Sequence, residues 1–263
     1  MEKPARLITI AFSHYCGLAR WALDRGAVAY REEGHLPLAS IWHTKRAGAT
    51  RTTPALVLTT GEVLDSSVAI LRYADSQLAA KDRLMPAETA ATAEVDAWLA
   101  RFDRTLGPAT RRYAYGHLLG DSALAKKFMA GWAPAGERWL AGSCYPVLRT
   151  AIRRALAVTP AKVELSRARV DEVFGEVETQ LADGRRYLLG DRFGAADLSF
   201  AALASPAVVP DHRESRMPAL EDVPEEFAGA VRRWRARPAG QFVERLWSEH
   251  RGESRASVST AQA

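Results

Sequence analysis

The chain has 263 residues, of which 48% are apolar and 25% are charged, and its formal net charge is +5. This length fits one large domain or two small ones, and the composition is that of an ordinary globular protein. No apolar run approaches the roughly 20 residues of a membrane-spanning helix, and the basic clusters alternate with acids, so we expect neither a membrane nor a nucleic-acid partner.

Targeting and redox signals are equally sparse. The apolar run after Arg6 is too short for a signal peptide, which favours the cytoplasm. The two cysteines, Cys16 and Cys144, are too few for a disulfide framework or a four-cysteine zinc site. The histidines form no HExxH pattern, so the sequence predicts no metal.

The first eighty residues alternate between strand and helix patterns. A short apolar run with a polar stop predicts a buried strand over 7–13, and helical spacing ending at Gly26 predicts a helix over 15–26. A second strand is expected over 28–33, followed by a polar loop. Two short strands, 55–58 and 61–64, then form a hairpin, and a helix follows over 66–79.

This order predicts an α/β domain of thioredoxin type over residues 1–80. The helix between the first two strands acts as a crossover, so those strands should pair in parallel.

The composition changes near Lys81, after which helical spacing dominates. We therefore predict a linker over 81–86, an all-helical domain over 87–250 and a disordered tail over 251–263. The strongest helical patterns cover 88–106, 162–182, 197–204 and 227–247. The intervening segment 107–165 holds Trp132, Trp139, Tyr145 and Pro146, which either line an apolar cleft for a substrate or belong to the core and loops.

Ser13 stands where the first strand passes into the first helix. A serine there commonly caps the helix by accepting a backbone N–H hydrogen bond. The same position suits a functional hydroxyl, because the positive end of a helix favours a nearby thiolate and the hydroxyl can donate to it. Either role fits the residues alone.

Three motifs in their order and spacing resemble the glutathione-binding half of a glutathione transferase. They are Ser13-His14-Tyr15-Cys16 after the first strand, Thr53-Pro54 before the third, and Asp65-Ser66 before the last helix of the domain. The segment from Tyr187 to Leu198 resembles the folding motif of the helical domain of that family, with Gly194 in place of the usual capping Ser or Thr.

The resemblance implies a fold, a co-substrate and a set of contacts. The fold is a thioredoxin-like domain followed by an all-α domain. Glutathione would bind along the first domain, with its thiol activated by Ser13 and its main chain paired with Thr53 before a cis Pro54. Its γ-glutamyl group would meet Asp65 and Ser66.

The resemblance also implies an electrophilic, apolar small-molecule substrate, a role in detoxification and a homodimer. Two alternatives to a glutathione transferase remain open.

The first depends on Cys16, which is either a packed residue of the first helical turn or a reactive thiol. If it is reactive, the protein is a glutathione-dependent disulfide or deglutathionylation enzyme. The second alternative is a non-catalytic interaction module, because a fold does not determine a function.

Overall fold

The computed structural model describes residues 4–50, 52–252 and 257–258. The chain divides into two compact units. The first unit contains residues 1–78, 121–155 and 252–263, and the second contains 79–120 and 156–251. Within the described ranges, no helix has both the length and the apolar character that crossing a membrane requires.

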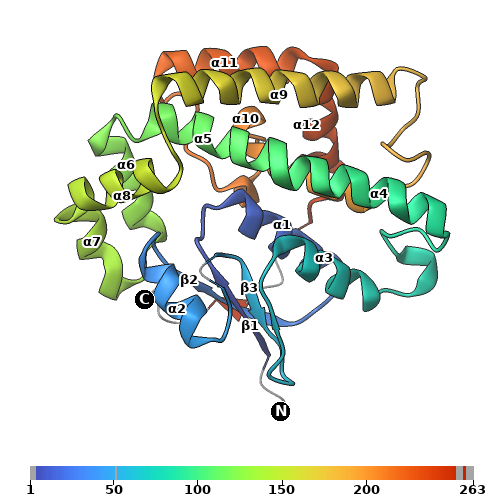
Figure 1. The fold of residues 1–263 in the computed structure, drawn as a ribbon, viewed down its shortest axis with the longest axis horizontal. Helices are drawn as coiled ribbons and strands as arrows, with labels where there is room; N and C mark the ends of the chain where they lie inside the picture. Colours follow the sequence, from blue (N-terminus) through green and yellow to red (C-terminus); the bar gives the residue numbers. More distant parts are fainter. Residues whose placement is uncertain (1–3, 51, 253–256, 259–263) are drawn as a thin grey trace. The chain divides into compact units, whose positions relative to one another are not determined.

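A five-stranded mixed sheet forms the centre of the first unit, in the order β4-β3-β1-β2-β5. Figure 1 labels its strands β1, β2 and β3. The parallel pairing of β1 with β2 confirms the predicted crossover, and β3 and β4 form the predicted hairpin. β3 runs antiparallel to β1, and β5 is parallel to β2. The strands are β1 (Ala5–Thr9), β2 (Tyr30–Gly34), β3 (Ala55–Val57), β4 (Val63–Leu64) and β5 (Ser257–Val258).

Helices α1 (His14–Arg25) and α3 (Ser67–Ser76) pack against each other in the first unit. Their apolar side chains are buried because both helices place apolar residues at helical spacing on one face. Gly26, which ends α1, is required by this packing, since a Cβ there would lie 2.6 Å from the carbonyl oxygen of Ala74.

The polar loop expected after β2 contains a helix, α2 (Ala39–Arg46), so that expectation was wrong. Only Ile41 and Trp42 are large apolar residues in this helix, which is too few to show a helical period in the sequence. Trp42 remains 59% exposed and stacks with the guanidinium of Arg46.

The helical segment 121–155 belongs to the first unit, although it lies within the range 87–250 predicted as the all-helical domain. Phe128 packs on Phe12 with ring centroids 5.1 Å apart, and Glu137 Oε2 accepts a hydrogen bond from the Leu36 amide at 2.7 Å. Such contacts between distant residues leave no local pattern in the sequence. The segment forms α6 (Ser122–Trp132), a 3-10 turn (Ala135–Glu137), α7 (Arg138–Gly142) and α8 (Tyr145–Ala155).

Most of the tail predicted to be disordered lies outside the described residues. Of residues 251–263, the structure describes 251–252 and 257–258. Ser257 and Val258 form β5 and pair with Arg31 and Glu32. For these two residues the expected disorder is wrong.

The second unit is helical throughout its described elements and is built around α10 (Ala195–Val208), in which every residue is buried. Phe200 of α10 packs between Phe102 and Phe174, with ring centroids 5.2 Å and 5.7 Å away. The surrounding helices are α4 (Thr89–Arg101), a π-helical turn (Phe102–Leu106), α5 (Gly107–Leu118), α9 (Pro160–Leu181), α11 (Glu225–Ala236) and α12 (Pro238–His250), with single 3-10 turns at Ala80–Asp82 and Arg213–Ser215.

Asp197 organises the start of α10. Its carboxylate accepts hydrogen bonds from the amides of Gly194 at 2.8 Å and Leu188 at 2.9 Å. Burial raises the pKa of Asp197 to about 6, against the opposing effect of these amide donors. Gly194 supplies no side chain, so the carboxylate of Asp197 provides the capping interaction alone, as the sequence indicated.

A buried ion pair links the sheet of the first unit to α1. Arg20 Nη1 donates to Glu32 Oε1 at 2.8 Å, and the Thr9 hydroxyl donates to the same oxygen at 2.7 Å. The two charged side chains are only 1% and 9% exposed. Removing one partner of a buried pair is costly because the remaining charge stays out of water.

We predict that Arg20→Met lowers the free energy of unfolding by about 3–5 kcal/mol, since the Glu32 carboxylate would lose the cation that faces it. The neighbouring pair, Arg6 with Glu33, is a matched control because the Arg6 side chain is 48% exposed. Arg6→Met should cost less than about 1 kcal/mol. Urea unfolding of both variants measures the difference, and equal losses would contradict the assigned role of the buried pair.

Candidate functional site

The register of the strands brings the predicted site residues to one edge of the sheet. Ile8 in β1 pairs with Ala55 in β3, and Leu56 pairs with Leu64 in β4. The chain therefore leaves β1, enters β3 and leaves β4 at the same end of the sheet. Thr53-Pro54 directly precede β3 and Asp65-Ser66 directly follow β4, whereas Ser13 follows β1 after three intervening residues.

Ser13 is the residue before α1, with an extended backbone (φ −76°, ψ 128°). Its carbonyl accepts from the Gly17 amide at 2.8 Å, as expected of a capping position. Within the described residues, however, its hydroxyl makes no hydrogen bond to cap the helix. The structure thus removes the local capping role as the reason for a serine here.

Cys16 lies in the first turn of α1 and is completely buried. Burial raises the pKa of its thiol above the ordinary value, whereas the charge of Arg20 and hydrogen bonds from the Ile10 backbone and the side chains of Ser13 and Thr53 lower it. Burial is the larger effect. At neutral pH Cys16 is therefore a protonated, inaccessible thiol, and the hydroxyls of Ser13 and Thr53 both approach its sulfur.

The Thr53–Pro54 peptide bond is cis, as the resemblance implied. Pro54 is buried and Thr53 half-buried, and β3 starts at the next residue. Among the backbone hydrogen bonds of the described residues, none uses the amide or carbonyl of Thr53. These main-chain groups are suited to pairing with another extended chain, in the way that an edge of a sheet does.

Ser66 caps α3: its hydroxyl oxygen accepts from the Ala69 amide at 3.1 Å, and its carbonyl accepts from the Ile70 amide at 3.0 Å. Ser66 is exposed and Asp65 is half-buried beside it. The amides of Ser67 and Val68, in the first turn, have no partner within the helix. The start of α3 therefore offers amide donors and a partial positive charge to a carboxylate.

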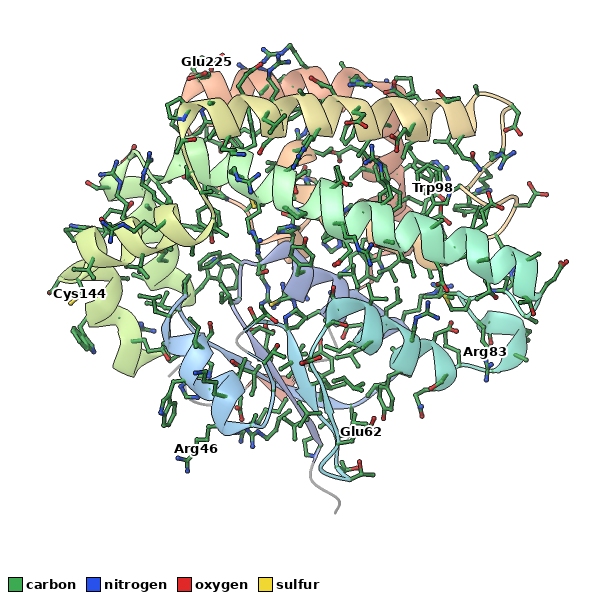
Figure 2. All side chains as sticks on the ribbon, viewed as in Figure 1. Arg46, Glu62, Arg83, Trp98, Cys144 and Glu225 are labelled. Carbon is green, nitrogen blue, oxygen red and sulfur yellow. The ribbon has the colours of Figure 1, made fainter. Side chains whose placement is uncertain are left out.

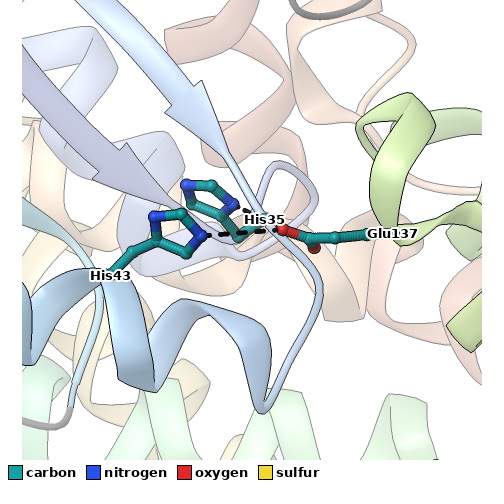
Figure 3. A group of neighbouring side chains, drawn as sticks. All are labelled: His35, His43 and Glu137. Atoms are coloured by element: carbon teal, nitrogen blue, oxygen red, sulfur yellow. Dashed lines mark hydrogen bonds and ion pairs between the residues drawn. The ribbon is translucent and has the colours of Figure 1, made fainter.

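Sequence reasoning missed a polar cluster at the same end of the sheet (Figure 3). His35 follows β2, and its amide donates to the Thr9 carbonyl at 2.8 Å. His35 Nδ1 lies 2.7 Å from Glu137 Oε1, and His43 Nε2 lies 3.9 Å from the same oxygen. Burial is the main cause that lowers the pKa of His43. With His35 and Glu137 102 positions apart, no sequence spacing could have indicated this cluster.

Sequence comparisons identify both halves of the chain. A family model described as glutathione S-transferase, N-terminal domain, matches residues 7–82, and one described as glutathione S-transferase, C-terminal domain, matches residues 160–237. Together they cover more than half of the chain. A search of curated proteins returns no match.

Solved structures share the fold. A glutathione S-transferase of Ceriporiopsis subvermispora in complex with glutathione is 15% identical, with a TM-score of 0.59 over 93% of this chain and 95% of that chain. A glutathione transferase from Phanerochaete chrysosporium is 16% identical, with a TM-score of 0.59 over 97% and 100%. A β-etherase from Sphingobium sp. strain SYK-6 is 20% identical, with a TM-score of 0.58 over 92% and 98%.

The two cysteines should differ sharply in reactivity. Cys144 is partly exposed and lies between α7 and α8 (Figure 2), whereas Cys16 is buried and the pKa of its thiol is raised. In native protein at pH 7, the single thiol of Cys144→Ser should react with an aromatic disulfide reagent at least about tenfold more slowly than that of Cys16→Ala. Fast labelling of Cys144→Ser without unfolding would show that Cys16 is accessible after all.

Proposed function

Since the chain belongs to the glutathione S-transferase family, we propose that it is a glutathione transferase that activates the thiol of glutathione for attack on an electrophilic, apolar small molecule. The observation that carries the proposal is the meeting of Ser13, the cis Thr53–Pro54 peptide and the start of α3 at one edge of the sheet. Each supplies one kind of contact that a γ-glutamyl tripeptide needs.

Glutathione binding would use main-chain and carboxylate contacts. The amide and carbonyl of Thr53 pair with the cysteinyl backbone of glutathione, which tolerates Thr at this position because only the main chain takes part. The α-carboxylate of the γ-glutamyl group sits at the N-terminus of α3, where the amides of the first turn and the Ser66 hydroxyl donate to it. Asp65, which precedes Ser66, would support the ammonium group of the γ-glutamyl residue electrostatically.

Thiol activation would depend on Ser13. Its hydroxyl, which approaches the Cys16 sulfur in this structure, would turn its single hydrogen toward the glutathione sulfur, and this bond is stronger when the sulfur is an anion. Each unit of pKa lowering requires about 1.4 kcal/mol of preference for the thiolate. One charge-assisted hydrogen bond together with the positive end of α1 can lower the pKa by roughly one to two units.

The chemical step is a nucleophilic attack. The thiolate donates an electron pair to the electrophilic carbon of the second substrate, forming a carbon–sulfur bond, and a leaving group departs or the electrons move onto an acceptor within the substrate. The protein contributes the ionised nucleophile and holds both reactants close together, which converts a bimolecular encounter into a reaction within one complex.

The alternative mechanism through Cys16 has less support. A thiol–disulfide enzyme needs an accessible thiolate, and Cys16 is completely buried with its pKa raised by that burial. Its position matches a packed residue of the first turn of α1.

A non-catalytic interaction module would lack the glutathione affinity that the next experiments measure.

We expect Ser13→Ala to lower kcat/KM for conjugation of a chlorodinitrobenzene by roughly ten- to a hundredfold, because the thiolate loses its hydrogen-bond donor. The apparent pKa of bound glutathione, read from thiolate absorbance, should rise by about one to two units. Ser13→Thr, which keeps the hydroxyl, should retain most of the activity. If Ser13→Ala has unchanged activity and bound-thiol pKa, Ser13 does not activate glutathione.

Ser66 allows affinity to be separated from stability. Ser66→Gly should leave the free energy of unfolding within a few tenths of a kcal/mol, because glycine is an acceptable cap. Its dissociation constant for glutathione should nevertheless rise about fivefold or more, since a hydrogen bond to the carboxylate is lost. The control is Ser76→Ala, at the other end of α3, which should bind glutathione normally. Calorimetric titration compares the three proteins.

The remaining expectations concern assembly and location. The family resemblance implies a homodimer. Light scattering on the protein peak from a size-exclusion column should therefore give the mass of two chains, and the mass of one chain would refute the homodimer. A role in detoxification remains a prediction of the same resemblance, and a cytoplasmic location remains a prediction from the short apolar run after Arg6.

A further inference from the structure

Helix α2 and the residue before it expose large apolar side chains and bury small polar ones. Ser40 and Thr44 are buried, whereas Leu38 is 46% exposed and Trp42 is 59% exposed. At about 100° per residue, Leu38 and Trp42 lie on the side of the helix opposite Ser40 and Thr44. An ordinary surface helix has the reverse arrangement, with its apolar stripe toward the core. The outer face of α2 is therefore suited to a partner that accepts apolar groups.

The same face of α2 is positively charged. Lys45 and Arg46 follow Trp42 by three and four positions, which places them on its side of the helix. The guanidinium of Arg46 lies 5.4 Å from the centre of the Trp42 ring, and Arg46 extends from the outer side of α2 (Figure 2). Within the part of the chain that the structure describes, neither cation forms an ion pair.

A second exposed tryptophan lies close to α2 in the first unit. Glu137 Oε1 is 3.9 Å from Nε2 of His43, whose ring packs edge-on against Trp42, and α7 begins directly after Glu137. Trp139, in the first turn of α7, is 59% exposed, and Arg138 is exposed beside it. Three of the five large apolar side chains that are exposed among the described residues therefore meet here. We define the aromatic-basic patch as Leu38, Trp42, Lys45, Arg46, Arg138 and Trp139.

The fold concentrates positive charge around this patch. Residues 35–50 and 121–155, which contain the patch and the helices beside it, hold eight basic residues and two acidic ones. The whole chain holds 36 basic and 31 acidic residues, so the rest of the chain is nearly neutral. The sequence does not show this concentration, because residues 51–120 separate the two segments.

The carboxylates near the patch have other partners. Asp121 caps α6 by accepting hydrogen bonds from two amides of its first turn. Glu137 Oε1 is 2.7 Å from Nδ1 of His35, and Glu33, which acts electrostatically on the nearby His43, is bridged by Arg6. Among the described residues, none of these carboxylates pairs with a cation of the patch, so its positive potential is not cancelled by an ion pair.

These features match the surface of a bilayer that contains anionic lipids. Tryptophan rings favour the headgroup region, and basic side chains are attracted to a negatively charged leaflet. A single-stranded nucleic acid would use the rings and the charges, but it offers no apolar phase for Leu38. A second copy of the chain is disfavoured, because a two-fold contact would bring the same positive patch against itself.

We propose that the aromatic-basic patch docks the protein on the surface of a bilayer that contains anionic lipids. Leu38, Trp42 and Trp139 enter the headgroup region, and the three cations of the patch approach the lipid phosphates. The protein then lies on the membrane without spanning it. The sequence-based expectation of no membrane partner rested on spanning runs and on charges dispersed along the chain, and neither bears on a patch that the fold assembles.

The test is sedimentation of the protein with vesicles of phosphatidylcholine, either alone or with about 30% phosphatidylglycerol. We expect binding to the mixed vesicles to be at least about tenfold stronger, and to weaken as salt is raised from about 0.05 M to about 0.5 M. Trp42→Ser combined with Trp139→Ser should weaken it at least about tenfold. Lys45→Gln combined with Arg46→Gln should weaken it about fivefold for each charge removed. The altered side chains are exposed, so these variants should fold, which circular dichroism verifies.

Two controls make the same kinds of change on the second unit. Leu165 is 40% exposed and Arg233 is exposed, so Leu165→Ser and Arg233→Gln should bind vesicles like the unaltered protein. The proposal is wrong if the unaltered protein does not bind the mixed vesicles, if phosphatidylcholine alone binds equally well, or if the double tryptophan variant binds undiminished. It is also wrong if the patch variants lose affinity for a single-stranded oligonucleotide that the protein binds more tightly than vesicles, or if the double tryptophan variant converts a dimer into a monomer.

Discussion

The pairing register of four short strands, β1 to β4, is the constraint on which the proposed site depends. Ile8 opposite Ala55, Leu56 opposite Leu64 and Thr9 opposite Gly34 fix where the chain leaves each strand. Leu7 and Ile8 point to opposite faces of the sheet and are both fully buried, so a slip of one residue would force each side chain into packing that fits the other. The same constraint that forms the core therefore sets the positions of the loops that carry polar groups.

Ser13 and Cys16, which are three residues apart at the start of α1, have different surroundings. Ser13 precedes α1 at the edge of the sheet, whereas Cys16 points into the core three residues later. Burial keeps the Cys16 thiol protonated, and the Ser13 hydroxyl is not used to cap the helix within the described residues. The start of α1 thus places the unreactive Cys16 sulfur in the core and the Ser13 hydroxyl at the edge of the sheet. From there the hydroxyl could donate a hydrogen bond to the sulfur of glutathione.

Local patterns predicted the strands and helices well where they carry a clear period. The crossover, the hairpin and the long helix α9 follow from residues close in sequence. The predicted helix over 227–247 is two helices, α11 and α12, divided before Pro238, and the proline was visible in the sequence. Gly240 lets the second helix pass close to the first, because a Cβ there would overlap the Trp234 carbonyl.

What the sequence could not predict depends on contacts between distant segments. The grouping of residues 121–155 with the sheet, and the approach of Glu137 to His35, arise from tertiary packing without a local signal. The buried pair of Arg20 and Glu32 is a similar case, since neither residue type indicates burial. By contrast, the motifs at Ser13, Pro54 and Ser66 were recognisable because each is tied to the end of a strand or helix.

The most direct test of the account is a crystal structure of the protein with glutathione. If Ser13 activates glutathione, the glutathione sulfur should lie within about 3.5 Å of Ser13 Oγ, which is within reach of a hydrogen bond to sulfur. The γ-glutamyl carboxylate should lie at the start of α3. A sulfur bonded to Cys16, or glutathione bound away from Thr53 and Ser66, would contradict the account.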